Sequence, residues 1–337
     1  MDEAALEELL SRPSPAVVAG LSRLEGDLAI LGAGGKMGPS LARLARRALD
    51  EAGNPARVIA VSRFTEPGVP AALAGAGVET IAADLLDPGA LEKLPSCPNL
   101  ILMAGQKFGT AQDSARTWAT NALLPGLVGY RFRKSRIAAF STGNVYPLWP
   151  AGTPGPSETD PTGPVGEYAW SALARERVLE FSSRRYGTPL AILRLNYAIE
   201  PRYGVLRDLA DRVVQGLPVD VSMGKVNVIW QRDASEVALC SLGRAAVPPL
   251  VVNLTGRAAH PVRWLAGELG RRLGREPVFQ GEEQYTALLS DAGRMAELFG
   301  EPETSIETML DRVAEWVQAG GRSLGKPTHF EERSGAF

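Results

Sequence analysis

The sequence is poor in the residues that build disulfide and metal sites. Its 337 residues include only two cysteines, Cys97 and Cys240, and only two histidines, His260 and His329. A disulfide framework or a His/Cys zinc site needs more ligands than these. We therefore expect neither kind of site, and no catalysis that depends on a bound metal.

Lysine is also scarce, and basic residues are in no excess. The chain has 36 Lys and Arg against 38 Asp and Glu, and only six of the basic residues are lysines. A net charge of −2 provides no broad positive field for a phosphate backbone, so nucleic acid is not an expected partner. A catalytic step that needs a titratable amine therefore has few candidate residues.

No apolar run is long enough to cross a membrane. The longest runs, such as residues 100–104, have the length of a strand, whereas a membrane helix needs about 20 residues. The acidic first eight residues are the reverse of a signal peptide. We expect a cytoplasmic protein without a membrane partner, and its 45% hydrophobic content is enough for a large core.

Short apolar runs alternate with helical patterns through the first two thirds of the chain. The predicted strands lie near residues 27–32, 56–62, 78–83, 98–104, 136–141 and 189–195. The predicted helices between them lie near residues 38–52, 112–134 and 167–186. This alternation is typical of an α/β protein with a doubly wound parallel sheet, the Rossmann arrangement.

After residue 195 the pattern changes to shorter mixed segments, with helices expected near 233–246, 261–274 and 304–319. This change predicts a smaller C-terminal substrate domain. The full prediction is a helical N-terminal arm (1–26), a dinucleotide-binding domain (27–195, with 226–246 returning to it), a substrate domain (196–225 and 247–320) and a C-terminal tail (321–337).

Four glycines, Gly32, Gly34, Gly35 and Gly38, follow the first predicted strand and open the first predicted helix of the sheet. In this context glycines permit a tight turn, a close approach of backbone to a pyrophosphate, and close packing of helix on strand. The alternative is a turn needed only for packing. We predict a bound dinucleotide held by Gly32, Gly34, Gly35, Lys36, Met37 and Gly38.

The second predicted strand ends at Ser62 and Arg63, where an enzyme that selects NAD usually presents a carboxylate. These two side chains suit a 2′-phosphate, so we expect NADP rather than NAD, although Arg63 could also be a solvated surface charge. Asp84 could bond the adenine amino group or could cap the following helix. The other expected cofactor contacts are Leu85, Ala104 and Gly105.

With these residues in view, the chain resembles the extended short-chain dehydrogenase/reductase family, also called the NAD-dependent epimerase/dehydratase family, over about residues 27–320. The motifs that carry the resemblance are Gly32-x-x-Gly35-x-x-Gly38, Asp84, Asn121, Ser141-Thr142-Gly143-Asn144-Val145-Tyr146, Glu167-Tyr168, Arg194-Leu195-Asn196-Tyr197 and Asp233-Ala234. The resemblance implies that Thr142 is the catalytic Ser/Thr and Tyr168 the acid/base tyrosine. It also implies that Asn196 contacts the substrate and that Asn121 supports the active-site end of the sheet.

The sequence departs from the family pattern four residues after the tyrosine, where Ala172 replaces the usual lysine. A neighbouring ammonium lowers a tyrosine pKa from about 10 by about one to three units, so its loss costs roughly 1.5 to 4 kcal/mol in proton transfer. Three interpretations remain. Lys107 could supply the missing charge or bind a substrate carboxylate. Tyr168 could act as a weak acid/base or hydrogen-bond donor, helped by Thr142 and by the positive charge of an oxidised nicotinamide. The protein could also bind a dinucleotide without redox turnover.

The resemblance also bears on the substrate. Members that act on nucleotide sugars usually carry an arginine at the position of Val226, so a large nucleotide sugar is not expected. We predict a sugar, a sugar acid or a related polyhydroxy or keto acid, although each polar residue could instead be structural. The candidate substrate contacts are Lys107, Asn144, Asn196, Tyr197, Arg202, Asn227, Gln231 and Arg232.

Apolar positions recur on the two longest predicted helices, at Trp118, Leu123, Leu124, Val128 and Tyr130 and within 167–186. Members of the family often pair such helices across a two-fold axis, so a homodimer is compatible with the pattern, as is packing within one chain. The sequence as a whole predicts an NAD(P)-dependent oxidoreductase or epimerase acting on a small molecule. The alternative is a dinucleotide-binding protein of the same fold.

Overall fold

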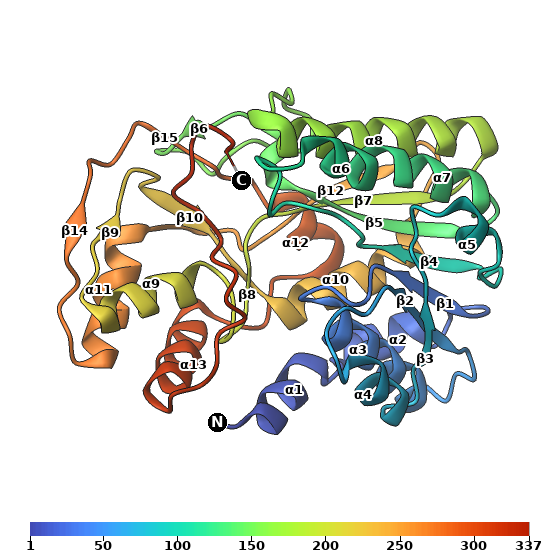
Figure 1. Ribbon diagram of the computed structural model, residues 1–337, viewed down its shortest axis with the longest axis horizontal. Coiled ribbons are helices and arrows are strands. Elements are labelled where there is room, and N and C mark those ends of the chain that lie inside the picture. The colour runs from blue at the N-terminus through green and yellow to red at the C-terminus, as the bar shows by residue number, and fades with distance from the viewer. Residues whose placement is uncertain (337) are drawn as a thin grey trace.

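A seven-stranded parallel sheet forms the centre of the protein in the computed structural model, which describes residues 1–336 (Figure 1). The strand order is β12-β7-β5-β4-β1-β2-β3. The order reverses between β1 and β4, which is where such sheets bind ligands. The predicted doubly wound fold is confirmed. The strands are β1 (Leu28–Leu31), β2 (Val58–Ser62), β3 (Glu79–Ala82), β4 (Asn99–Leu102), β5 (Arg136–Thr142), β7 (Leu190–Leu195) and β12 (Leu250–Leu254).

Most residues of the central strands are apolar because both faces of the sheet are covered there. In β1, Leu28 and Ile30 face one helical layer, while Ala29 and Leu31 face the other. The first layer contains α2 (Pro15–Leu21), α3 (Gly38–Glu51) and α10 (Gln231–Ser241). The second contains α5 (Pro88–Glu92), α7 (Leu124–Arg131) and α8 (Gly166–Tyr186). On the β3 side of the sheet, α4 (Val69–Gly75) contacts both α3 and β3.

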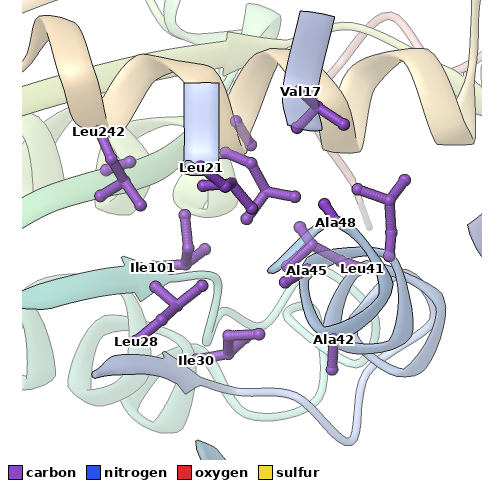
Figure 2. Packing of buried hydrophobic residues seen from close by; sticks show 14 of the residues in the cluster. Val17, Leu21, Leu28, Ile30, Leu41, Ala42, Ala45, Ala48, Ile101 and Leu242 are labelled. Atoms are coloured by element: carbon purple, nitrogen blue, oxygen red, sulfur yellow. The ribbon is translucent and has the colours of Figure 1, made fainter. Parts of the chain in front are cut away.

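The N-terminal arm is part of the first layer. It consists of α1 (Glu3–Ser11), capped by Asp2, and α2, capped by Ser14 with Pro15 in the first turn. Figure 2 shows Val17 and Leu21 of α2 among buried side chains of α3, β1 and β4. The arm therefore covers α3, the helix that follows the glycine turn.

The predicted helix over 112–134 is continuous but changes its winding. It consists of α6 (Ser114–Trp118), a π-helical turn (Ala119–Leu123) and α7. Such turns are frequent at functional sites because they redirect one side chain. Here the π-helical turn carries Asn121, which is fully buried.

A smaller unit with its own apolar core lies beside the carboxyl edge of the sheet. Its helices are α9 (Val205–Gln215), α11 (Val262–Leu273) and α13 (Ile306–Gln318). Its short strands pair as β8 (Ala198–Ile199) with β11 (Ile229–Trp230), β9 (Val219–Asp220) with β14 (Phe279–Gln280), β10 (Lys225–Asn227) with β13 (Ala259–Pro261), and β6 (Trp149–Pro150) with β15 (Thr286–Ala287).

Two segments differ from the predicted domain boundaries. β12 pairs with β7 at the edge of the large sheet, and Met295 of α12 (Gly293–Phe299) packs into the core of that sheet. Both lie within the range 247–320 that the sequence assigns to the substrate domain. An isolated apolar run contains no information about which of two sheets it joins, because the choice depends on distant partners.

The C-terminal tail is an extended strap. Residues 319–336 leave α13 and cross in front of the junction between the two units (Figure 1). Thr328 and Phe330 are buried, and Arg333 donates to the Thr286 carbonyl at 2.7 Å. Within the described residues, no helix combines the length and apolar character needed to span a bilayer.

Candidate active site

A cavity of about 590 Å³ lies at the carboxyl ends of β1, β4, β5 and β7. The glycine turn forms one side and the strap, through residues 325–328, forms another. The candidate catalytic residues Thr142, Tyr168 and Lys107 all line this cavity. The tertiary structure thus brings together side chains from the end of a strand, from a helix and from a loop.

Two glycines of the turn are required by close approaches of the backbone. Gly32 has φ +95°, and a Cβ there would lie 2.4 Å from the Ala104 nitrogen. A Cβ on Gly38 would lie 2.3 Å from the Ala33 carbonyl oxygen. The helix α3 begins at Gly38 without a side-chain cap or an acidic residue in its first turn. Its first N–H groups and its dipole therefore favour an anion.

The residues expected near the adenosine end lie along the neighbouring strand ends. Ser62 ends β2, and its Oγ would be 2.6 Å from a Cβ on Gly34. Arg63 is exposed beside it. Asp84 is also exposed and accepts from the Leu86 backbone N–H at 3.0 Å, while Asp87 caps α5.

Tyr168 lies in the first turn of α8 and forms a side-chain hydrogen bond with Thr142 at the end of β5. Thr142 Oγ1 also donates to Asn144 Oδ1 at 3.0 Å. Burial raises the pKa of the Tyr168 hydroxyl above its ordinary value, and the Thr142 hydrogen bond and the charge of Arg175 oppose that rise. A nearby positive charge would therefore help Tyr168 to form the phenolate.

Arg175 supplies such a charge, from a position that the sequence reasoning missed. It lies seven residues, or two helical turns, after Tyr168 on the same face of α8. Its guanidinium donates to the Phe140 carbonyl and to Asn121 Oδ1, each at 2.7 Å. A Cβ on Gly105 would lie 2.6 Å from Nη2, so Gly105 makes room for it.

The hydrogen-bond partners of Arg175 are neutral oxygens of the backbone and of Asn121. Burial lowers the pKa of Arg175, and the nearby Tyr168 hydroxyl acts in the opposite direction. The positive charge is therefore not neutralised by its hydrogen-bond partners, and it favours the phenolate of Tyr168. The same-face spacing was the sequence signal that could have identified Arg175.

Asn121 forms hydrogen bonds with both the loop after β4 and helix α8. Its Oδ1 accepts from the Gln106 backbone N–H at 2.9 Å, and its Nδ2 donates to the Gln106 carbonyl and to Ser171 Oγ. The π-helical turn thereby joins the loop after β4 to α8. This arrangement fits the supporting role that the family resemblance implies for Asn121.

A buried ion pair fixes α8 on the sheet. Arg194 of β7 bonds Glu176 of α8 at 2.8 Å, and both side chains are at most 4% exposed. Ser141 also donates to Glu176 at 2.5 Å, and Arg194 donates to the Tyr146 hydroxyl at 2.6 Å. These contacts set the height of Tyr168 above the end of β5.

Lys107 follows β4 and contacts the strap. Its Nζ donates to the Thr328 carbonyl at 3.0 Å and lies 5.8 Å from the centre of the Tyr168 ring. Burial lowers the pKa of Lys107 to about 8. Asn144, Asn196 and Tyr197 also line the cavity.

Four of the predicted substrate contacts lie elsewhere. Arg202 bonds the buried Glu200 and also Glu3 and Glu7 beside a neighbouring cavity, so three carboxylates take up its charge. The side chains of Gln231, Asn227 and Arg232 bond Ser40, Gly256 and Glu303 respectively. Spacing alone could not reveal these partners, since each is at least 29 residues distant.

Comparisons with known proteins agree with this architecture. A sequence profile of the NAD dependent epimerase/dehydratase family matches residues 28–235. The chain belongs to this family of enzymes. A search of curated proteins for relatives found no match.

Several solved structures share the fold. The UDP-glucose 4-epimerase of Thermotoga maritima, solved with UDP-glucose, is 20% identical with a TM-score of 0.72, over 87% of this chain and 99% of that one. WbmG of Bordetella bronchiseptica, solved with NAD, is 20% identical with a TM-score of 0.74, over 91% and 98%. The UDP-glucuronic acid 4-epimerase of Bacillus cereus is 14% identical with a TM-score of 0.71, over 87% and 99%.

Proposed function

We propose that this protein is an NAD(P)-dependent epimerase or oxidoreductase that acts on a small sugar, sugar acid, or polyhydroxy or keto acid. The observation that carries the proposal is the bond between Tyr168 and Thr142 in a cavity shared with the glycine turn. Arg175, buried beside them, supplies the positive charge that is missing at Ala172, where the family usually has a lysine.

The glycine turn fits a dinucleotide because it has no side chain where the backbone must approach the ligand. Gly32, Gly34 and Gly35, with the first turn of α3, would hold the pyrophosphate. Ser62 and Arg63 would hold a 2′-phosphate, which favours NADP over NAD. When bound, the nicotinamide supplies a carbon that accepts or returns a hydride.

The chain's own residues would handle the proton. Thr142 and Tyr168 would both bond the reacting hydroxyl, and Tyr168 would take its proton as the carbon–hydrogen bond breaks. Arg175 would stabilise the phenolate form of Tyr168 that accepts this proton, and Asn121 would keep Arg175 in place. Asn144 and Asn196, which line the same cavity, would bond neighbouring hydroxyls.

Two features favour a small substrate. Val226, at the position of the family's diphosphate-binding arginine, is fully buried in the core of the smaller unit. The strap also lines the cavity through residues 325–328 and reduces the room for a nucleotide. The neighbours that bind UDP-sugars share the fold, and these two features support a smaller substrate for this chain.

A screen with two readouts tests the proposal. Neutral sugars, sugar acids and sugar phosphates are incubated with NAD or NADP in deuterated water, while NMR follows the substrate and absorbance follows reduced nicotinamide. An epimerase gives a new epimer without solvent deuterium at the inverted carbon, and a dehydrogenase accumulates reduced cofactor. A protein that binds the dinucleotide but yields neither product is a binding protein, and the proposal is then wrong.

The proposed cofactor preference makes a separate prediction. Replacing Arg63 with alanine is expected to weaken NADP binding about tenfold and to leave NAD binding unchanged, because only NADP offers a 2′-phosphate to the guanidinium. Calorimetry with both coenzymes measures this, with the exposed Arg133→Ala as a control. Equal binding of NAD and NADP by the native protein contradicts the preference.

We also propose a homodimer formed through α7 and α8. Leu124 and Val128 are buried within the chain, so they do not contribute to it. Large apolar side chains nevertheless remain exposed on the two neighbouring helices, including Leu123, Tyr130, Trp170 and Phe181, and Phe181 is 65% exposed. A two-fold axis beside these helices would cover them.

Sedimentation equilibrium tests the dimer. The native chain is expected to sediment at twice its 35.9 kDa mass. Phe181→Glu is expected to give monomers, because it places a charge in an apolar contact. Val278→Glu, at an exposed apolar position of the smaller unit, is the matched control and should remain dimeric. A native monomer contradicts the proposal.

A further inference from the structure

Three of the six lysines line the same cavity. Lys36 comes from the glycine turn, Lys107 from the loop after β4, and Lys326 from the strap. The other 30 basic residues are arginines. The rarest cation of this chain is therefore concentrated at the candidate active site, on three segments that are far apart in sequence.

Lys36 is held by aromatic rings. Its Nζ lies 3.4 Å from the centre of the Tyr203 ring and 4.1 Å from that of Phe108. Within residues 1–336, this buried Nζ has no hydrogen-bond partner. Cation–π contacts replace only part of the lost hydration. Burial lowers the pKa of Lys36 to about 6, and the charges of Lys326 and Lys107 act in the same direction.

The lysine cluster consists of Lys36, Lys107 and Lys326, and the acidic groups near it are engaged in other contacts. Asp208 faces both Lys36 and Lys107, but its Oδ2 already accepts from the Thr328 N–H at 2.7 Å and from the Thr328 hydroxyl at 2.5 Å. Burial raises the pKa of the Asp208 carboxyl. Glu331 and Glu332 on the strap are the other carboxylates that act on Lys107. Asp208 is thus the carboxylate that acts on both Lys36 and Lys107, and it is already engaged by Thr328.

We propose that an anionic group of the substrate, a carboxylate or a phosphate, binds among Lys36, Lys107 and Lys326. This inference rests on the proposed function and narrows its substrate class to sugar acids, keto acids and sugar phosphates. An anion would supply the hydrogen-bond acceptor that Lys36 lacks, and it would balance the like charges. Because Lys326 and the carbonyl that holds Lys107 both belong to the strap, the strap completes the anion site.

The cluster also predicts how affinity depends on pH. In the ligand-free protein Lys36 is charged only below about pH 6 and Lys107 below about pH 8. Because an anion binds the charged forms, its affinity is expected to fall as the pH rises from 6 to 9. Burial holds the pKa of Tyr203 well above this range, so Tyr203 does not titrate there.

A thermal titration tests the site with inorganic phosphate as the probe. The full chain is first saturated with NAD, so that the pyrophosphate position at α3 is filled, and phosphate is then compared with chloride at equal ionic strength. We expect a saturable rise in melting temperature with phosphate alone, larger at pH 6.5 than at pH 9. Lys36→Met and Lys326→Met are each expected to weaken the apparent affinity about tenfold or more.

The controls separate the explanations. Lys134→Met, at an exposed lysine outside the cavity, should behave as the native protein does. Lys36→Met should still fold and melt no lower than the native protein, because it removes a buried amine. A phosphate effect that equals that of chloride, or one that survives both lysine variants, overturns the inference. If NAD fails to raise the melting temperature, the titration is repeated with NADP, and if neither coenzyme raises it the proposed function fails instead.

Discussion

The Tyr168→Phe variant is expected to lose about 10²- to 10⁴-fold in kcat on the substrate found by the screen, because phenylalanine fills the same space but cannot carry a proton. The Tyr168 hydroxyl is the group that bonds Thr142 inside the cavity. The dissociation constant of the dinucleotide and the melting temperature should change little, since the ring and its packing remain. Steady-state kinetics, calorimetry and thermal melting on one preparation provide the three measurements.

The matched control is Tyr285→Phe, which removes the same hydroxyl from a side chain that is 92% exposed in the other unit. It should retain native kinetics. If Tyr168→Phe retains native kcat, Tyr168 is not the acid/base group, and a different cavity residue must move the proton. A loss of dinucleotide binding in parallel would instead indicate a structural role.

The Arg175→Met variant is expected to lower kcat/KM in the oxidation direction about 10- to 1000-fold at pH 7, because a neighbouring cation lowers a tyrosine pKa by about one to three units. Phenolate is the form that accepts the proton, so losing the cation shifts the rise of activity to higher pH. The deficit should therefore shrink as the pH approaches the new pKa. The pH profile of kcat/KM is the decisive measurement.

One further variant distinguishes charge from structure at this position. Arg175→Met removes one donor each from the Phe140 carbonyl and from Asn121 Oδ1, so some loss of stability is expected as well, about 1–3 kcal/mol. Adding Ala172→Lys to Arg175→Met returns a cation one turn after Tyr168 and should move the pH profile back. An unshifted profile in Arg175→Met contradicts the electrostatic role.

The glycine turn could be predicted from the sequence because its signal is local, and Thr142 and Tyr168 were predicted because they match short motifs of the family. Gly32 stands directly after an apolar run, and Tyr168 lies in the first turn of a predicted helix. Local spacing also predicted the six central strands to within a few residues. These features depend on neighbours in the chain, so a sequence pattern records them.

Arg202 and Arg175 show the opposite case. Arg202 looked like a substrate contact, but carboxylates at positions 3 and 7 take up its charge. Arg175 looked like an ordinary helical arginine, but the glycine at 105 and the amide at 121 create a buried place for it. Glu200, two residues from Arg202, also bonds it, but the other partners named here lie at least 54 residues away.

The sequence by itself determined the layered sheet and the position of the glycine turn, because periodicity and short motifs encode contacts between near neighbours, and the family resemblance pointed to Thr142 and Tyr168. Only the tertiary structure decided which cationic side chains line the cavity, and only it showed that β12 joins the large sheet. It alone showed that the tail crosses the cavity to bring Lys326 toward Lys36. Burial and charge pairing depend on segments that meet only when the chain folds, and no local pattern specifies which segments those are.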